Sequence, residues 1–211
     1  MSGRIFCLMG KSVSGKDTIY KHLLREESLG LKKVVIYTTR PKRQKEEYDR
    51  EYHFCGEDTY QRFKDEGRII EERAYETYYG LWRYFTADDG QIDLATGDYL
   101  IIGTVEAFRS LKAYFGADHV VPLFIRVDDG IRLARALARE RKQKEPAYEE
   151  MCRRFLADAA DFSEEKVREA GIDVFFDNDT DSVLDCAAQV IDYVRSFQDP
   201  AVKDRETADG D

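Results

Sequence analysis

The sequence lacks the features that mark a membrane-spanning, secreted or metal-stapled protein. None of its apolar runs approaches the ~20 residues that a transmembrane helix needs, and its N-terminus shows no signal-peptide pattern. It has only four cysteines, without paired spacing, and three histidines, which argues against a disulfide framework and against a zinc site. We therefore expect a cytoplasmic protein whose cysteines are small apolar side chains.

The sequence also has fewer basic than acidic residues. The 42 acidic residues outnumber the 33 lysines and arginines, which gives a formal net charge of −9. Nucleic acids and anionic membrane surfaces are polyanions, so this balance argues against both as non-specific partners. With 43% hydrophobic residues there is enough apolar material for a core, and 211 residues suit one α/β domain with room for a small insertion.

Short apolar runs alternate with helical patterns along most of the chain. Near-continuous apolar runs are typical of parallel strands that are covered on both faces. Five runs have this character: Ile5–Met9, Val34–Tyr37, Tyr99–Ile102, Val120–Val127 and Val174–Phe176. Apolar residues recur at helical spacing within residues 105–115, 151–162 and 183–194. The alternation predicts an α/β fold with a doubly wound, five-stranded parallel sheet and ligands at the carboxyl ends of its strands.

Two segments interrupt the alternation. Residues 38–95 are rich in Tyr, Glu and Arg, with one helical pattern near Glu57–Glu66, and predict a small inserted subdomain because they are too long for a crossover loop. Residues 139–147 are basic and polar, and predict a lid. The expected organisation is one domain over residues 1–198, followed by a flexible acidic tail over residues 199–211.

A glycine-rich segment directly follows the first apolar run. Residues 10–18 fit the phosphate-binding pattern Gly-x-x-x-x-Gly-Lys, and an amphipathic segment follows them. The backbone N–H groups of such a turn and the positive end of the next helix converge on one anion. We predict that Lys16 reaches the outer phosphates of a nucleoside triphosphate; an ordinary loop with a lysine is the alternative. The predicted contacts are Gly10, Lys11, Ser12, Val13, Ser14, Gly15, Lys16, Asp17 and Thr18.

Further motifs follow in order. Residues 38–43 read Thr-Thr-Arg-Pro-Lys-Arg, and residues 46–54 read Glu-Glu-Tyr-Asp-Arg-Glu-Tyr-His-Phe. Residues 69–71 read Ile-Ile-Glu, and residues 78–80 read Tyr-Tyr-Gly. Together with the phosphate-binding segment, their order and spacing resemble guanylate kinases over nearly the whole chain. The resemblance implies a transferase of purine nucleotide metabolism that moves a phosphoryl group from ATP to GMP or dGMP.

The resemblance assigns an acceptor site to these motifs. It implies that Arg40 and Arg43 grip the acceptor phosphate, since a planar guanidinium can bond an anion bidentately. Tyr52 and Tyr79 match tyrosines whose hydroxyls complete this clamp. Glu71 matches a glutamate that accepts hydrogen bonds from the N1–H and 2-amino groups of guanine. A solvated basic face, packed aromatic rings and a surface carboxylate stay open as the respective alternatives.

Transfer chemistry needs positioning and charge neutralisation more than covalent chemistry. The resemblance places lid arginines at Arg139 and Arg141 and an arginine of the following helix at Arg154, and we predict that they act as catalytic residues together with Lys16. A solvated helix face is the alternative for any one of the arginines. Three neighbours could act in their place: Arg132, Arg135 and Arg153.

The donor side has its own implied residues. Asp17 stands where a hydroxyl residue usually follows the loop lysine, and we predict that it holds Mg²⁺, which prefers oxygen ligands and keeps several waters. Asn178 resembles an asparagine that lies beside the adenine of ATP; a helix N-cap is the alternative. The expected cofactors are ATP and Mg²⁺, and the expected partners are small-molecule nucleotides bound by a monomer or a small homo-oligomer.

Three positions depart from the family's pattern around the base. Ile36 replaces a serine or threonine, Leu81 replaces a small hydroxyl residue, and Ile102-Gly103-Thr104 stands at an Asp-x-Asp motif. Polar contacts to a base edge are a source of selectivity, so guanine recognition would depend mostly on Glu71. Two alternatives therefore stay open: a kinase of the same fold with another phosphorylated acceptor, and a non-catalytic guanylate-kinase-like binding module.

Overall fold

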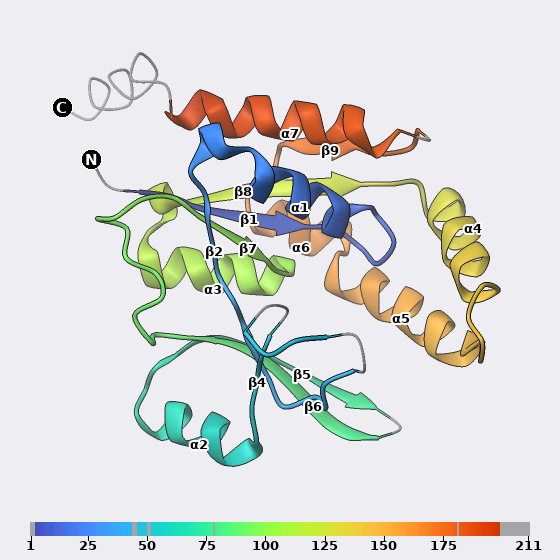
Figure 1. The fold of residues 1–211 in the computed structure, drawn as a ribbon, viewed down its shortest axis with the longest axis horizontal. Coiled ribbons are helices and arrows are strands. Elements are labelled where there is room, and N and C mark those ends of the chain that lie inside the picture. Colours follow the sequence, from blue (N-terminus) through green and yellow to red (C-terminus); the bar gives the residue numbers. More distant parts are fainter. Residues whose placement is uncertain (1–2, 44–45, 50–51, 78, 181, 199–211) are drawn as a thin grey trace.

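The computed structural model contains two β-sheets with helices packed around them (Figure 1). It describes residues 3–43, 46–49, 52–77, 79–180 and 182–198. The predicted tail over residues 199–211 lies outside the described residues. None of the described helices is long and apolar enough to span a membrane.

The larger sheet confirms the predicted α/β fold. Its five strands are all parallel, in the order β2-β7-β1-β8-β9. The central strand β1 pairs Ile5 with Tyr99 on one side and with Val120 on the other. The strands are β1 (Ile5–Met9), β2 (Lys32–Lys33), β7 (Tyr99–Ile102), β8 (Val120–Arg126) and β9 (Phe175–Asp177).

One predicted strand was wrong. Residues 34–37 do not form a strand of the parallel sheet; the strand at this edge is β2, and the next strand, which starts at Tyr37, belongs to the second sheet. Val34 and Ile36 are nevertheless buried, because this segment crosses the core between the two sheets. The apolar run indicated burial correctly, but burial does not require strand pairing.

Helices cover both faces of the parallel sheet, as its apolar strands require. On one face Phe6 and Leu8 pack with residues of α1 and α7, and on the other Ile5, Cys7 and Met9 pack with residues of α3 and α6. These helices are α1 (Lys16–Arg25), α3 (Val105–Phe115), α6 (Glu164–Glu169) and α7 (Val183–Gln198). Two short 3₁₀ helices are Glu27–Leu29 and Ala117–His119.

The second sheet has four strands in the order β4-β3-β6-β5. Its strands are β3 (Tyr37–Thr38), β4 (His53–Phe54), β5 (Ile69–Thr77) and β6 (Gly80–Ala87), and α2 (Glu57–Asp65) packs beside them. Tyr60, Phe63 and Phe85 form a small core of their own under α2. On the opposite face, Glu71, Arg73 and Tyr75 alternate along β5. This face looks toward the parallel sheet, because Ile70, Tyr52 and Tyr84 pack into the core of that sheet.

Two further helices stand apart from the sheets in Figure 1: α4 (Asp129–Glu140) and α5 (Tyr148–Asp161). The segment predicted as a lid, residues 139–147, begins in the last turn of α4 and ends at the residue before α5. The buried carboxylate of Glu140 accepts a hydrogen bond from the Ala147 N–H at 2.7 Å. The turn between the two helices is therefore fastened at both ends.

Candidate active site

The glycine-rich segment forms a tight turn between β1 and α1. Gly15 has a φ of 88°, and a Cβ at this position would come within 2.5 Å of the Asn178 side-chain nitrogen, so glycine is required. Val13 also has a positive φ, 66°, which a β-branched side chain adopts only under strain. Because α1 begins at Lys16, the N–H groups of its first turn lie at the loop, where an anion can bind them.

Three side chains at this loop have groups that could bind a phosphate or its metal ion: Ser14, Lys16 and Asp17. The Ser14 hydroxyl is fully buried and finds no hydrogen-bond partner among the residues that the structure describes. The Lys16 ammonium lies 3.6 Å from an Asp17 carboxylate oxygen, and that carboxylate is largely exposed. An exposed carboxylate beside a phosphate loop fits Mg²⁺, which takes few protein ligands and completes its shell with water and phosphate oxygens.

A carboxylate from α5 is bound to the loop. The Ser12 N–H donates to an Asp158 oxygen at 2.8 Å, and the Ser12 hydroxyl donates to the other oxygen at 3.2 Å. Arg132, which is 1% exposed, donates to the same carboxylate at 2.8 Å and stacks on the Phe155 ring at 4.2 Å. This network joins the loop to α4 and α5. No sequence pattern indicated Asp158, because an aspartate inside a helix has many possible partners.

A cavity of about 230 Å³ opens beside the loop. The predicted Asn178 is buried there, and its side-chain amide donates to the Ser14 carbonyl at 2.8 Å. Arg135 donates to the carbonyls of Asn178 and Thr180 at 2.9 and 2.7 Å. Asn178 therefore holds the loop in place through its side chain. It is not the N-cap of α7, because that helix begins at Val183. The flat guanidinium and the aliphatic wall of this cavity suit a planar base.

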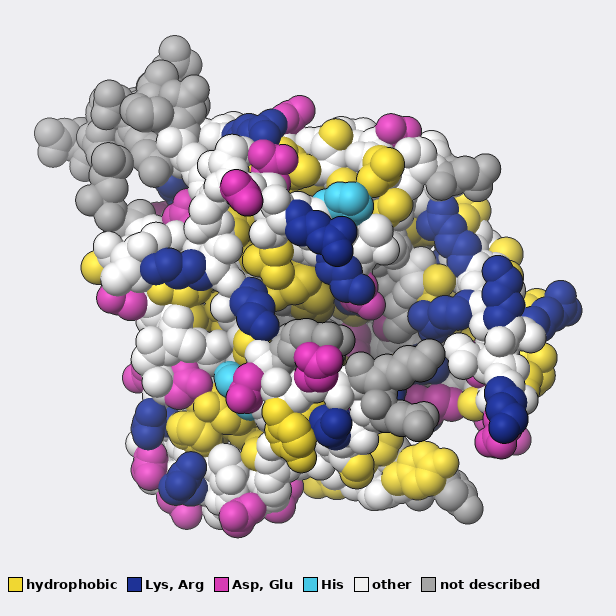
Figure 2. Space-filling view, in the orientation of Figure 1, with side chains coloured by type: hydrophobic (Ala, Val, Ile, Leu, Met, Phe, Trp, Pro, Cys, Tyr) yellow, Lys and Arg dark blue, Asp and Glu magenta, His cyan; other side chains and the backbone are white. Residues whose placement is uncertain are grey.

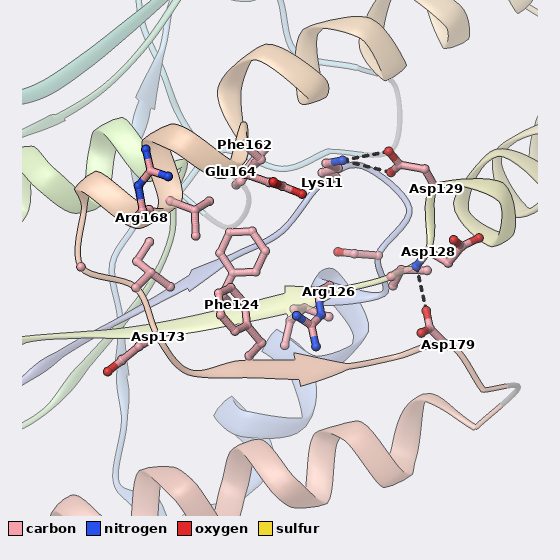
Figure 3. A pocket seen from close by; sticks show the side chains of 17 residues that line it. Lys11, Phe124, Arg126, Asp128, Asp129, Phe162, Glu164, Arg168, Asp173 and Asp179 are labelled. Carbon is pink, nitrogen blue, oxygen red and sulfur yellow. Dashed lines mark hydrogen bonds and ion pairs between the residues drawn. The ribbon is translucent and has the colours of Figure 1, made fainter.

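A larger cavity, of about 810 Å³, touches the same loop at Lys11 and Ser14 (Figure 3). The Lys11 ammonium is paired there with Asp129 at 3.0 Å. Apolar side chains such as Phe124 and Phe162 form much of the wall, and neither Lys16 nor any predicted acceptor residue lines it. Size alone therefore does not identify the site of chemistry.

The predicted clamp arginines share one carboxylate. Arg40 is 3% exposed, and its two terminal nitrogens donate to Glu46 at 2.8 and 3.0 Å. The Arg43 N–H donates to the same carboxylate at 2.8 Å. Although burial opposes it, hydrogen bonding to Arg40 and Arg43 lowers the pKa of Glu46. Glu46 thus places a negative charge where a phosphate would be gripped.

The two predicted tyrosines lie in different surroundings. Tyr52 is partly buried, with the Arg40 guanidinium 5.4 Å from its ring centre and Tyr84 packed edge-on against it. Burial is the main cause that raises the pKa of Tyr52. Tyr79 lies in the turn between β5 and β6, is 78% exposed and stacks on Trp82. The structure thus places Tyr52 at the clamp and Tyr79 at the tip of a hairpin.

Arg154 on α5 is a half-buried arginine among other charged groups. Burial lowers its pKa and the positive charges of Arg139 and Arg43 lower it further, against the opposing charge of Glu150 at 3.4 Å. The predicted catalytic residues Arg139 and Arg154 are thus brought near a clamp residue, whereas Arg141 is exposed just beyond α4. Figure 2 shows lysine and arginine side chains gathered over the region of α4 and α5. Mutual repulsion of this kind is relieved by an anion such as a phosphate.

Glu71 is buried on β5 and is paired within the protein. Arg73 donates to its two oxygens at 3.1 and 3.2 Å, and the Thr86 hydroxyl donates at 2.9 Å. Against the effect of burial, the Glu71 charge raises the pKa of Arg73. Sequence reasoning missed Arg73, although residues two apart on a strand share a face and this spacing could have indicated it.

Known proteins resemble this chain in sequence. A family model described as guanylate kinase matches residues 2–84. The guanylate kinase of Oleidesulfovibrio alaskensis is 40% identical over 80 residues, which cover 37% of this chain and 38% of that protein. The chain therefore spans less than half the length of this relative. The guanylate kinase of Cupriavidus metallidurans is 28% identical over 162 residues, covering 76% of this chain and 71% of that protein.

A solved structure resembles the chain in fold. The crystal structure of guanylate kinase from Anaplasma phagocytophilum matches with a TM-score of 0.60, covering 93% of this chain and 87% of that one at 21% identity. The segment matched by the family model contains the glycine-rich loop, Arg40, Arg43 and Glu71. The chain is thus similar to guanylate kinases in sequence over residues 2–84 and in fold over most of its length.

Proposed function

We propose that the protein transfers a phosphoryl group from ATP to GMP or dGMP, giving ADP and GDP or dGDP. The observation that carries this proposal is the glycine-rich loop, where the first-turn N–H groups of α1, Lys16 and the buried Ser14 hydroxyl, which has no hydrogen-bond partner among the described residues, lie together. Such groups suit the phosphates of a donor nucleotide, and arginines on the acceptor side suit a transferring phosphoryl group, whose charge is spread over several oxygens. Similarity to guanylate kinases in sequence and in fold supports the same reaction.

The donor would bind at the glycine-rich loop. Its phosphates would take the N–H groups of the turn and of the first turn of α1, and Lys16 would neutralise the outer phosphates. The cavity beside Arg135 and Asn178 would take the adenine. Asp17 would hold Mg²⁺, which neutralises phosphate charge when it is bound with ATP. Asp158 would release the Ser12 N–H as the phosphates enter.

The acceptor would bind between the second sheet and α5. Its phosphate would take the place of the Glu46 carboxylate between Arg40 and Arg43, with Tyr52 beside them. Residues 38–95 would form the acceptor-binding insert and residues 139–147 a lid that excludes water from the transferring group. We infer a cytoplasmic protein that acts on small-molecule nucleotides as a monomer or a small homo-oligomer.

An assay of ADP release with a panel of acceptors tests the proposal. We expect ATP- and Mg²⁺-dependent release with GMP and dGMP, and much slower release with AMP, CMP or a sugar phosphate. Faster turnover of another phosphorylated acceptor would assign a different substrate to the same fold. If no acceptor is phosphorylated while a nucleotide still binds in calorimetry, the proposed transfer reaction is wrong.

A further inference from the structure

We propose that Arg73 is a base-reading residue, which donates hydrogen bonds to O6 and N7 of guanine while Glu71 accepts from N1–H and the 2-amino group. This inference rests on the proposed function, because it concerns the acceptor of that reaction. It assigns a second reader of the base to a position that no sequence motif marked.

The placement of Arg73 supports this role. It lies between Glu71 and Tyr75 on the face of β5 that looks toward the parallel sheet. Its partner across the strands is Tyr84, which packs edge-on against Tyr52 beside the Arg40 guanidinium. Tyr75 donates to Asp161 at the end of α5 at 3.1 Å, so the far side of this face is closed by that helix. Arg73 therefore lies on the same side of the second sheet as the residues of the predicted phosphate clamp.

The pair Glu71–Arg73 matches the edge of guanine group by group. Guanine presents two adjacent donors, N1–H and the 2-amino group, followed by two acceptors, O6 and N7. A guanidinium recognises O6 and N7 bidentately, and this is the commonest specific contact of arginine with guanine in nucleic acids. A carboxylate next to it meets the two donors. Adenine would place an amino group against Arg73 and a bare acceptor nitrogen against Glu71.

In this structure Arg73 donates to Glu71, and we take this arrangement as the state of the pair before a base binds. Three hydrogen bonds reach the Glu71 carboxylate, two from Arg73 and one from Thr86. A carboxylate has about four acceptor positions, so both donors of guanine fit only if Arg73 gives up at least one of its bonds. The guanidinium then turns its free donors to O6 and N7. The exchange buries no net charge, since the base is neutral and the pair stays together.

Arg73 also supplies polar contacts to the base, which the three departures from the family pattern remove. Ile36 and Leu81 have no polar side-chain atoms, and the Thr104 hydroxyl accepts from the Ala107 N–H as the N-cap of α3. Selectivity for a base edge arises because polar groups of the site are left unpaired by the wrong ligand. With those three positions unsuited to the task, the buried Glu71–Arg73 pair provides it.

Binding of GMP and its analogues to two variants tests the proposal. Calorimetry would compare GMP with 7-deaza-GMP, which lacks the N7 acceptor, and with inosine monophosphate, which lacks the 2-amino group. The test variant is Arg73→Gln. The matched control is Arg83→Gln, because Arg83 lies on the adjacent strand but pairs with Glu57 at the start of α2. Thermal unfolding of each protein checks that it is folded.

We expect the unaltered protein to bind GMP about tenfold more tightly than 7-deaza-GMP. In Arg73→Gln this preference should disappear, while the preference for GMP over inosine monophosphate, read by Glu71, should persist. Arg83→Gln should keep both preferences.

Equal binding of GMP and 7-deaza-GMP by the unaltered protein would overturn the inference without any variant, as would tighter GMP binding by Arg73→Gln. In both cases GMP still binds, so the proposed function stands. Absence of GMP binding by the unaltered protein would overturn the two together.

Discussion

The donor and acceptor sides of the cleft are built in different ways. The donor loop offers mainly backbone N–H groups, held in place by Gly15 and by Val13 in a strained conformation. The acceptor side offers side chains, and these are already paired inside the protein: Arg40 with Glu46, and Arg73 with Glu71. Main-chain groups are fixed by the fold, whereas side-chain charges stay buried only when a counter-charge accompanies them. We infer that the donor side is preorganised except at Ser12, whose N–H exchanges Asp158 for a phosphate, whereas the arginines of the acceptor side all exchange an internal partner for the substrate.

The largest effect is expected on the donor side, from Lys16→Ala. Removing one preorganised donor to developing charge typically costs about 10²- to 10³-fold in rate. We therefore expect kcat for ADP release to fall by about that factor, while binding of GMP changes little. Lys21→Ala, an exposed lysine one turn further along α1, is the control. Equal loss of activity in both variants would contradict the role of Lys16.

The second effect concerns the network that joins the loop to α4 and α5. Asp158→Ala leaves the buried Arg132 with Asp129 as its remaining carboxylate partner, and the loss of one charged hydrogen bond costs about 2 kcal/mol of unfolding free energy. Urea denaturation followed by circular dichroism measures the change. Asp192→Ala removes one of the two carboxylate partners of the exposed Arg195 on α7 and should change stability by less than about 0.5 kcal/mol. Similar losses in the two variants would show that the network contributes nothing special.

A smaller effect tests the internal partner on the acceptor side. The pKa of Glu46 is lowered in the folded protein, so its contribution to stability is present above its usual value of 4.5 and is lost as the pH falls through the folded-state value. Glu46→Gln should therefore lose about 1 kcal/mol at pH 7 and progressively less as the pH falls below 4.5. The same variant should bind GMP more tightly, because the phosphate no longer competes with a carboxylate for Arg40. Weaker GMP binding would contradict the exchange.

The smallest effect is expected from Val13→Gly. A β-branched residue in the left-handed region carries about 1–2 kcal/mol of strain, and part of the gain from its removal is offset by the greater chain entropy of glycine. We expect a net stabilisation of about 0.5 kcal/mol, measured as a small rise in the melting temperature. A clear loss of stability would mean that the Val13 side chain makes packing contacts that outweigh the strain.

Much of the fold could be predicted from the sequence, because it follows from local patterns. The run Ile5–Met9, the glycine-rich turn and the amphipathic segment after it give strand, loop and helix in order. The exchange of sheets at residues 34–37 could not be predicted, since an apolar segment that crosses a core has the same composition as a buried strand. The roles proposed for Arg40, Arg43, Glu71 and the lid arginines stay predictions until the assays above are done.

By itself the sequence determined the glycine-rich loop and four of the five strands of the parallel sheet. These depend on spacing within a few residues of the chain. Only the tertiary structure decided which charges pair. The loop meets Asp158 across 146 residues of sequence, and Glu71 selects Arg73 rather than any other nearby arginine. Charges attract without regard to order in the chain, so their partners are set by the burial and geometry that folding brings about.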